Sequence, residues 1–217
     1  MLLLRPPGVY PAQRDTWLLA EALQREQLAP GARVLDLGTG SGALAVLAAR
    51  AGGRVTAVDI SRRALTVAWL NARCRGLRLR VRHGDLVRPV IDERFDLVLS
   101  NPPYVPATLD RLPRRGIARC WDGGVDGRAV LDRVCTEGAK VLAPGGTLLL
   151  VHASLCGVAT TVRHLAGEGL DVEVADRCEH PFGPVLRARV ALLESRGLIE
   201  PGQRTEELVV IRGVKRG

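Results

Sequence analysis

The chain has 217 residues, which suffices for one α/β domain with a buried core and is too short for two domains of ordinary size. Hydrophobic residues make up 47% and charged residues 25%, so the composition excludes a disordered chain and gives no sign of a membrane protein. The net charge of +8 favours an acidic partner or RNA, but the basic residues are spread along the chain and a solvated surface explains them better.

Neither the cysteines nor the histidines are spaced like metal ligands. The five cysteines lie singly, without a C-x-x-C pair, and the four histidines include no H-E-x-x-H motif. We therefore expect reduced thiols and no metal site. The apolar start Met1 to Leu4 is shorter than a secretion signal, which predicts a cytoplasmic protein without a membrane anchor.

Strand and helix patterns alternate along the chain. The first helix is expected around residues 16–23, with Asp15 or Thr16 as its cap, inside an N-terminal lead-in over 1–30. The predicted strands are 33–37, 54–58, 77–82, 95–99, 147–151, 171–175 and 207–211, and the further predicted helices are 43–50, 62–74, 129–142 and 158–168. This alternation predicts one α/β domain over 1–217 with a doubly wound sheet. Residues 178–205 are expected to form an insertion between the last two strands, helical over 184–197 and without an assigned role.

A glycine-rich turn follows the first predicted strand and opens a helix. It runs from Asp36 through Gly38, Gly40 and Gly42, and glycines let a backbone approach a ligand closely. At the end of the second strand, Asp59 can accept hydrogen bonds from both hydroxyls of a ribose. The glycines also satisfy a dinucleotide pattern. Asp36 decides against it, because a carboxylate there attracts the ammonium of a methionine moiety and repels a pyrophosphate.

A third acid follows the third predicted strand. There Asp85 can accept a hydrogen bond from the amine of adenine, while Leu86 covers the ring. A Gly-Asp pair after a strand is also a common turn. Beside Asp36 and Asp59, however, we favour a cofactor role, and the three acids together predict S-adenosylmethionine as the ligand.

The fourth predicted strand ends in Asn101-Pro102-Pro103-Tyr104, the most specific motif of the chain. Ligands of an open parallel sheet bind beyond the carboxyl ends of its strands, so this motif should face the cofactor turn. The side-chain oxygen of Asn101 and the stiffly held Pro102 carbonyl can each accept one N–H of a planar amide or amine, which directs the nitrogen lone pair at a methyl group. Tyr104 would cover the flat face of the substrate. The alternative is a strand that simply ends at a proline turn.

In order and spacing these motifs resemble the HemK family of class I methyltransferases, the glutamine N5-methyltransferases of translation release factors. The resemblance is greatest to a short, single-domain branch, which shares Val9-Tyr10-Pro11, Asp15-Thr16 and Gly127-Arg128. It implies a Rossmann-like, seven-stranded, mostly parallel sheet with helices on both faces. The implied cofactor-binding residues are Thr16, Asp36, Gly38, Gly40, Gly42, Asp59, Asp85, Leu86 and Asn101, and the implied catalytic residues are Asn101, Pro102, Pro103 and Tyr104.

The resemblance leaves the acceptor and the partners open. It implies a protein glutamine amide, with a release factor as the expected substrate, yet the chain has no room before Asp36 for the helical domain with which full-length bacterial members dock that factor. Members of the short branch work with a small zinc-binding subunit, and some modify lysine. The loop over 116–128 would close over the substrate or simply be flexible.

Two other functions compete with this interpretation. The charge of +8 favours a methyltransferase of an exocyclic amine of adenine or guanine, although a duplex-acting enzyme needs further surface for base flipping, so RNA is the better nucleic-acid substrate. A binding module that has kept only the fold is the other alternative, since fold alone does not establish function. The intact Asn-Pro-Pro-Tyr motif argues against it.

Overall fold

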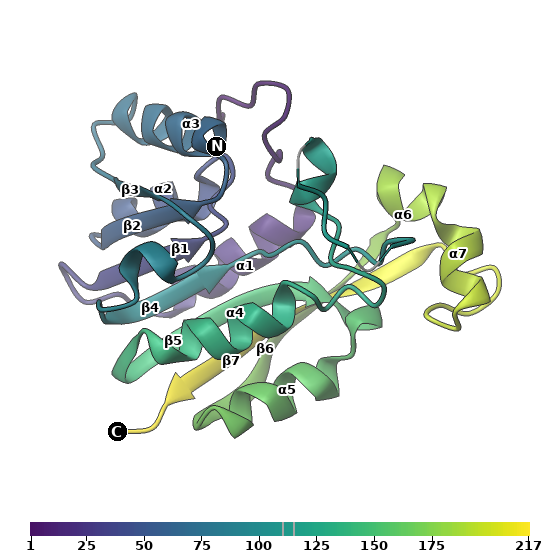
Figure 1. The fold of residues 1–217 in the computed structure, drawn as a ribbon. Helices are drawn as coiled ribbons and strands as arrows, with labels where there is room; N and C mark the ends of the chain where they lie inside the picture. Colours follow the sequence, from purple (N-terminus) through teal and green to yellow (C-terminus); the bar gives the residue numbers. More distant parts are fainter. Residues whose placement is uncertain (110, 115) are drawn as a thin grey trace.

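The computed structural model describes residues 1–109, 111–114 and 116–217, and within them seven strands form one sheet in the order β3-β2-β1-β4-β5-β7-β6 (Figure 1). The strands are β1 (Arg33–Leu37), β2 (Arg54–Asp59), β3 (Arg80–His83), β4 (Phe95–Ser100), β5 (Leu142–Ala153), β6 (Leu170–Pro181) and β7 (Thr205–Lys215). Strands β1 to β5 pair in parallel, while β7 lies antiparallel between β5 and β6. The expected seven-stranded, mostly parallel Rossmann-like sheet is confirmed.

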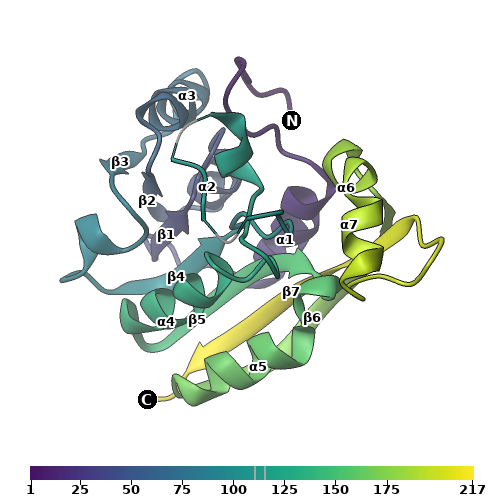
Figure 2. The ribbon, with the colours of Figure 1, turned by 45° about the vertical axis from the view of Figure 1, so that its right-hand side comes forward.

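Helices cover both faces of the sheet (Figures 1 and 2). Helices α1 (Arg14–Arg25), α2 (Ala43–Arg50) and α3 (Arg62–Arg73) lie in a row on one side, and α4 (Leu131–Lys140) packs beside α5 (Val158–Gly167) on the other. Because layers enclose β1 and β4 on both faces, these strands are apolar almost throughout, with Leu35 and Val98 fully buried. None of the described helices is long and apolar enough to cross a membrane.

The first helix begins earlier than expected, which corrects the assignment of its cap. Gln13 occupies the cap position, so Asp15 and Thr16 lie inside the first helical turn. Both side chains are buried rather than facing solvent. A polar pair buried at the start of a helix needs partners from elsewhere in the fold, and those partners come from the functional site described below.

The segment between the last two strands forms a small unit of its own. Strand β6 runs to Pro181 and β7 begins at Thr205, so part of the expected insertion is paired strand. The expected single helix is two short ones, α6 (Pro184–Ala188) and α7 (Val190–Ser195), which break at Arg189. Phe182, Leu186, Leu193 and Ile199 form a separate apolar cluster beneath them.

Candidate functional site

The glycine turn, Asp59, Asp85 and the Asn101–Tyr104 motif lie at the carboxyl ends of four adjacent strands, β1 to β4. Leu37 of β1 is in register with Val58 of β2 and with Ser100 of β4, and Asp59 is in register with His83 of β3. The Ser100 hydroxyl also donates to the Leu37 carbonyl, at 3.0 Å. The glycine turn after β1 and the motif after β4 are therefore neighbours, as the sequence predicted.

Asp36 is a buried acid directly beneath the glycine turn. Its Oδ2 accepts from the Thr39 hydroxyl at 2.6 Å and from the Ala45 amide at 3.1 Å. Burial outweighs these hydrogen bonds and raises the pKa of Asp36 to about 6. A carboxylate held in this way has little solvent to stabilise its charge, so an ammonium group is a favourable partner for it.

The turn itself is shaped by glycine conformations. Gly38 and Gly42 have φ values of 72° and 80°, in the left-handed region that other residues resist. A Cβ on Gly42 would lie 2.7 Å from the Cβ of Ala68, so only glycine lets α2 approach α3 at this point. These residues set the path of the backbone. The space above Gly38 stays open, because a Cβ added there would meet no atom within 4 Å.

Asp59 fastens the turn to the end of β2. Its Oδ2 accepts from the Gly40 amide at 3.0 Å and its Oδ1 from the Ser61 amide at 2.7 Å. Burial raises the pKa of Asp59 despite these two hydrogen bonds. A carboxylate has about four lone-pair positions, so it can still accept from two hydroxyls of a ligand.

Asp85 and Leu86 follow β3 at the same edge, where Asp85 has a partner that the sequence did not suggest. Arg133 of α4 donates to both of its carboxylate oxygens, at 2.9 and 3.2 Å. Leu86 adopts φ 46°, an uncommon conformation for a residue other than glycine. The adenine-binding role of these two residues stays a prediction. If Asp85 does bind adenine, Arg133 would hold its carboxylate in place.

Asp15 accepts hydrogen bonds from several hydroxyls around the Asn101–Tyr104 motif. Its Oδ2 accepts from the phenols of Tyr10 and Tyr104, at 2.9 and 3.1 Å, and its Oδ1 accepts from the Thr16 amide at 2.6 Å and the Thr16 hydroxyl at 3.2 Å. Because the Thr16 proton goes to Asp15, the Thr16 oxygen accepts from Asn101 Nδ2, at 3.1 Å. This chain fixes the orientation of the Asn101 amide and leaves its Oδ1 as the acceptor for a ligand.

A second acid lies close enough to Asp15 to be affected by its charge. Burial, and then the charge of Asp15, raise the pKa of Glu206 on β7 to about 8. Glu206 is therefore protonated near neutral pH, and its Oε2 has no hydrogen-bond partner among the described residues.

Cys156 and Gly127 contact the backbone of the Asn101–Tyr104 motif at the Tyr104 carbonyl. The Cys156 thiol donates to the Tyr104 carbonyl at 3.1 Å, and burial raises the pKa of that thiol, which keeps it a donor. Gly127 passes so close that a Cβ there would lie 2.2 Å from the same carbonyl. Tyr104 is itself buried, with its hydroxyl on Asp15, so both ends of this residue are fixed.

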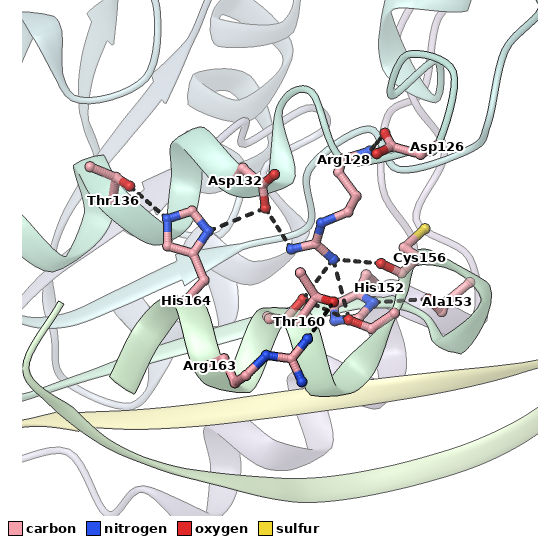
Figure 3. Close-up of polar contacts among 12 residues, drawn as sticks. Asp126, Arg128, Asp132, Thr136, His152, Ala153, Cys156, Thr160, Arg163 and His164 are labelled. Carbon is pink, nitrogen blue, oxygen red and sulfur yellow. Dashed lines mark hydrogen bonds and ion pairs between the residues drawn. The ribbon is translucent and has the colours of Figure 1, made fainter. Parts of the chain in front are cut away.

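Arg128 anchors the end of the glycine-rich loop (Figure 3). Its guanidinium donates to the carbonyls of Cys156 and Gly157 and pairs with Asp132, which in turn contacts His164. The arginine is 8% exposed, and a buried guanidinium with several acceptors is costly to displace. The loop over 123–128 is thus fastened beside Tyr104.

A cavity of about 30 Å³ lies between the glycine turn and Asn101. It is lined by residues of the N-terminal segment, the glycine turn and the catalytic motif, including Thr16, Asp36, Gly38, Gly40 and Asn101. A larger hollow of about 700 Å³ lies at the other end of the strands and is lined by none of the predicted site residues. We assign the site to the smaller cavity, because the convergent polar groups are there. No cluster of metal-binding side chains occurs in the described part of the chain.

Comparison with known proteins identifies the family. The model of the methyltransferase small domain matches residues 2–111. The chain belongs to the methyltransferase small domain family. It is 32% identical, over 81% of its length and 88% of the relative, to a Methanocaldococcus jannaschii protein provisionally named a protein N5-glutamine methyltransferase. The release factor glutamine methyltransferase of Gloeobacter violaceus is 36% identical over 76% of this chain, which spans 66% of that protein.

Other relatives and two solved structures extend the comparison. The ribosomal protein uL3 glutamine methyltransferase of Bradyrhizobium diazoefficiens is 46% identical over 54% of this chain and 39% of its own length. In fold, the chain is similar to the Mtq2–Trm112 complex of E. cuniculi, responsible for methylation of eRF1 (TM-score 0.66, 24% identity, 96% of this chain and 99% of that chain). It is also similar to the T. thermophilus 16S rRNA N2 G1207 methyltransferase (TM-score 0.59, 20% identity, 95% and 44%).

The resemblance to HemK-type methyltransferases and the expected enzyme class are confirmed by these relatives. The roles of individual site residues stay predictions. Sequence reasoning missed the function of three side chains at the motif: Asp15 was considered only as a helix cap, and Cys156 and Tyr10 were given no role. Tyr10 and the Asp15-Thr16 pair both stand in the pattern shared with the short branch, which was the available signal for them, whereas nothing in the sequence brings Cys156 to Tyr104.

Proposed function

We propose that this protein is an S-adenosylmethionine-dependent N-methyltransferase that modifies a glutamine side-chain amide in a protein, with a translation release factor as the first substrate to test. The observation that carries the proposal is the fixed amide of Asn101, whose Oδ1 is directed away from Thr16 beside the glycine turn. The names of the relatives support the same acceptor, although the chain spans about two thirds or less of the bacterial ones.

The cofactor residues of this chain fit that ligand in charge. Asp36 would bind the ammonium group of the cofactor and Asp59 its ribose hydroxyls. Asp85 and Leu86 would bind the adenine. Gly38, Gly40 and Gly42 would let the cofactor lie close to the backbone of the turn. Thr16 lines the same cavity as Asp36. The bound cofactor supplies a methyl group already activated by a sulfonium, so the protein need mainly align the acceptor.

The acceptor amide has two N–H groups and a lone pair delocalised into its carbonyl. Asn101 Oδ1 and the Pro102 carbonyl would each accept one N–H, which favours a pyramidal nitrogen with its lone pair directed at the methyl carbon. Asn101 and Pro102 would hold the nitrogen in line with the methyl group that a bound cofactor would supply. The nitrogen would gain the methyl carbon and release one proton, and the electron pair of the carbon–sulfur bond would leave with a neutral sulfur. Rigid support of Asn101 and Tyr104 serves this alignment.

An RNA base amine is the second proposed acceptor, because the net charge of +8 favours a polyanion. A lysine amine is a third, by resemblance alone. The expected small partner subunit and the cytoplasmic location also stay predictions. Asn101 and Pro102 suit any planar NH2 group, so the acceptor must be found by experiment.

The test is transfer of labelled methyl from S-adenosylmethionine to purified release factor, with ribosomal RNA and a basic protein assayed in parallel. We expect label on a release-factor glutamine, located by mass spectrometry and lost with Asn101→Ala. Label on RNA alone would move the function to the base methyltransferases. Label on lysine would retain the enzyme class and overturn the acceptor.

A further inference from the structure

The chain that leaves the catalytic motif forms a two-segment strap. Residues 105–108 continue directly from Tyr104 and run beside residues 121–125. The Val105 amide donates to the Trp121 carbonyl at 2.7 Å, and the Ala107 amide donates to the Gly124 carbonyl at 2.7 Å. An acceptor polypeptide whose side chain reaches the Asn101–Tyr104 motif would therefore lie next to the strap.

Arg189, at the break between α6 and α7, links the two segments of the strap. Its Nη1 donates to the Pro106 carbonyl at 2.8 Å, and its Nη2 pairs with the Asp122 carboxylate at 2.6 Å. Pro106 belongs to the first segment and Asp122 to the second. The Arg189 and Asp122 side chains are only 22% and 12% exposed, so this ion pair is largely shielded from solvent.

Arg196, just after α7, makes the same kind of link farther along. Its Nη1 donates to the Ala107 carbonyl at 2.8 Å and to the Val125 carbonyl at 2.9 Å, and its Nη2 donates to the Thr108 carbonyl at 3.2 Å. These acceptors again come from both segments. A planar guanidinium with several fixed donors suits such bridging, whereas an ammonium group acts as a single point charge.

The apolar side of the α6–α7 unit reaches the strap as well. The cluster of Phe182, Leu186, Leu193 and Ile199 packs against Val105, the residue that follows Tyr104. In both ribbon views, α6 and α7 lie beside the segment that leaves β4 (Figures 1 and 2). The unit thus contacts the strap by apolar packing at its start and by two arginines along its length.

We propose that the α6–α7 unit, residues 182–204, positions the protein substrate by clamping the strap through Arg189 and Arg196. This rests on the proposed function, since it assigns the strap as the wall along which the acceptor polypeptide lies. Both arginines are positioning residues, because they contact the strap and act on the acceptor through it. The proposal gives a role to the segment that the sequence left unassigned.

The experiment compares Arg189→Met and Arg196→Met, made singly, with Arg187→Met, which alters an exposed arginine on α6. Hydrogen exchange at the amides of Val105 and Ala107 measures the strap without any substrate. Steady-state kinetics with the protein acceptor identified by the labelling assay separate KM for the acceptor from kcat and from the affinity for S-adenosylmethionine. Arg189→Lys keeps the charge and loses the bridging geometry.

We expect at least tenfold faster exchange in the strap and at least fivefold higher KM for the acceptor in the Arg189 and Arg196 methionine variants. Cofactor affinity should stay within twofold, Arg187→Met should behave as wild type, and Arg189→Lys should restore only part of the loss. A merely structural role would lower thermal stability without this selective rise in KM.

Unchanged exchange in the strap would overturn the clamp, whatever the acceptor proves to be. Faster exchange with an unchanged KM would overturn its role toward the substrate. If the wild-type protein methylates no protein, the labelling assay shows this separately and the proposed function fails, while the exchange data still decide whether the clamp exists.

Discussion

The two halves of the site are built by contacts of very different reach. In the cofactor half, Asp36 accepts from residues three and nine positions away, and Asp59 from residues two and 19 positions away. In the acceptor half, Asn101 is held by Thr16 across 85 positions and Tyr104 by Asp15 across 89. The glycine turn with Asp36 and Asp59 is therefore a local structure, although Arg133 reaches Asp85 across 48 positions. The support of Asn101 and Tyr104, in contrast, exists only when distant parts of the fold meet.

This difference suggests that the two halves can be damaged separately. Loss of a local carboxylate should weaken ligand binding while the transfer geometry stays intact. Loss of a long-range contact should disturb transfer while the cofactor turn stays intact. The following predictions test that separation, in order of decreasing effect.

The largest effect is expected from Asn101→Ala. The variant lacks the side-chain oxygen that we propose orients the substrate nitrogen, so the single-turnover rate at saturating cofactor should fall by on the order of a hundredfold or more. A circular dichroism spectrum like that of the wild type would show that the fold is kept. Activity within a few-fold of wild type would remove Asn101 from the catalytic role.

Gly127→Ala should lower the free energy of unfolding by about 3 kcal/mol, because overpacking and backbone strain act together next to Tyr104. The new Cβ would lie 2.2 Å from the Tyr104 carbonyl, and the residue has φ 79°. Gly145→Ala is the matched control, with φ 72° and no neighbour within 4 Å, and should cost about 1 kcal/mol. Equal losses in urea unfolding would show that the contact with Tyr104 carries no energy.

Thr16→Val should lower the single-turnover rate of transfer roughly tenfold, because it removes the hydroxyl that accepts from Asn101 Nδ2 and so the hydrogen bond that orients the Asn101 amide. Thr16→Ser keeps that hydroxyl and should keep most of the activity. The measurement is single-turnover transfer under saturating cofactor. Equal rates for the valine and serine variants would exclude the Asp15–Thr16 relay as the support of Asn101.

The smallest effect is a pH dependence of cofactor binding. In the proposed role, Asp36 would bind the ammonium of the cofactor only when ionised. Its pKa is raised to about 6, so the affinity for the cofactor should fall about fourfold between pH 8 and pH 5.5. Burial also raises the pKa of Asp59, which acts in the same direction. Calorimetric titration should show this slope in the wild type and a much flatter one in Asp36→Asn.

The unliganded protein should show the opposite trend in stability. Because the folded-state pKa of Asp36 lies above the ordinary value of 3.8, its contribution to the free energy of unfolding is fully present below pH 3.8 and is lost as the pH rises through about 6. Asp36→Asn should therefore stabilise the free protein most at neutral pH. No gain at neutral pH would contradict the assigned burial penalty.

The difference between contacts that are close in the sequence and contacts that are far apart in it also decides what the sequence could predict. Strand β1 and helix α2 were predicted to the residue, because an apolar run and an alanine-rich periodic segment are local signals. The glycine turn and Asp59 were found for the same reason. The contacts of Asp15, Cys156 and Arg133 could not be found, because a single buried polar residue carries no sign of its partner.

The ends of elements show the same limit. The β6 and β7 strands are twelve and eleven residues long, whereas the sequence pattern indicated only 171–175 and 207–211 within them. Their outer residues are strand because they pair with each other, not because of their own propensity. The helical pattern over 184–197 was correct in kind, but the structure has two short helices that break at Arg189, whose side chain contacts the strap.

The most direct test of the separation is the calorimetric affinity for S-adenosylmethionine of Asn101→Ala and Asp59→Ala, measured side by side. We predict that Asn101→Ala stays within about threefold of wild type, while Asp59→Ala, which loses the acceptor of the ribose hydroxyls, binds at least about tenfold more weakly. If Asn101→Ala weakens binding as much as Asp59→Ala does, the two halves form one unit and the account is wrong.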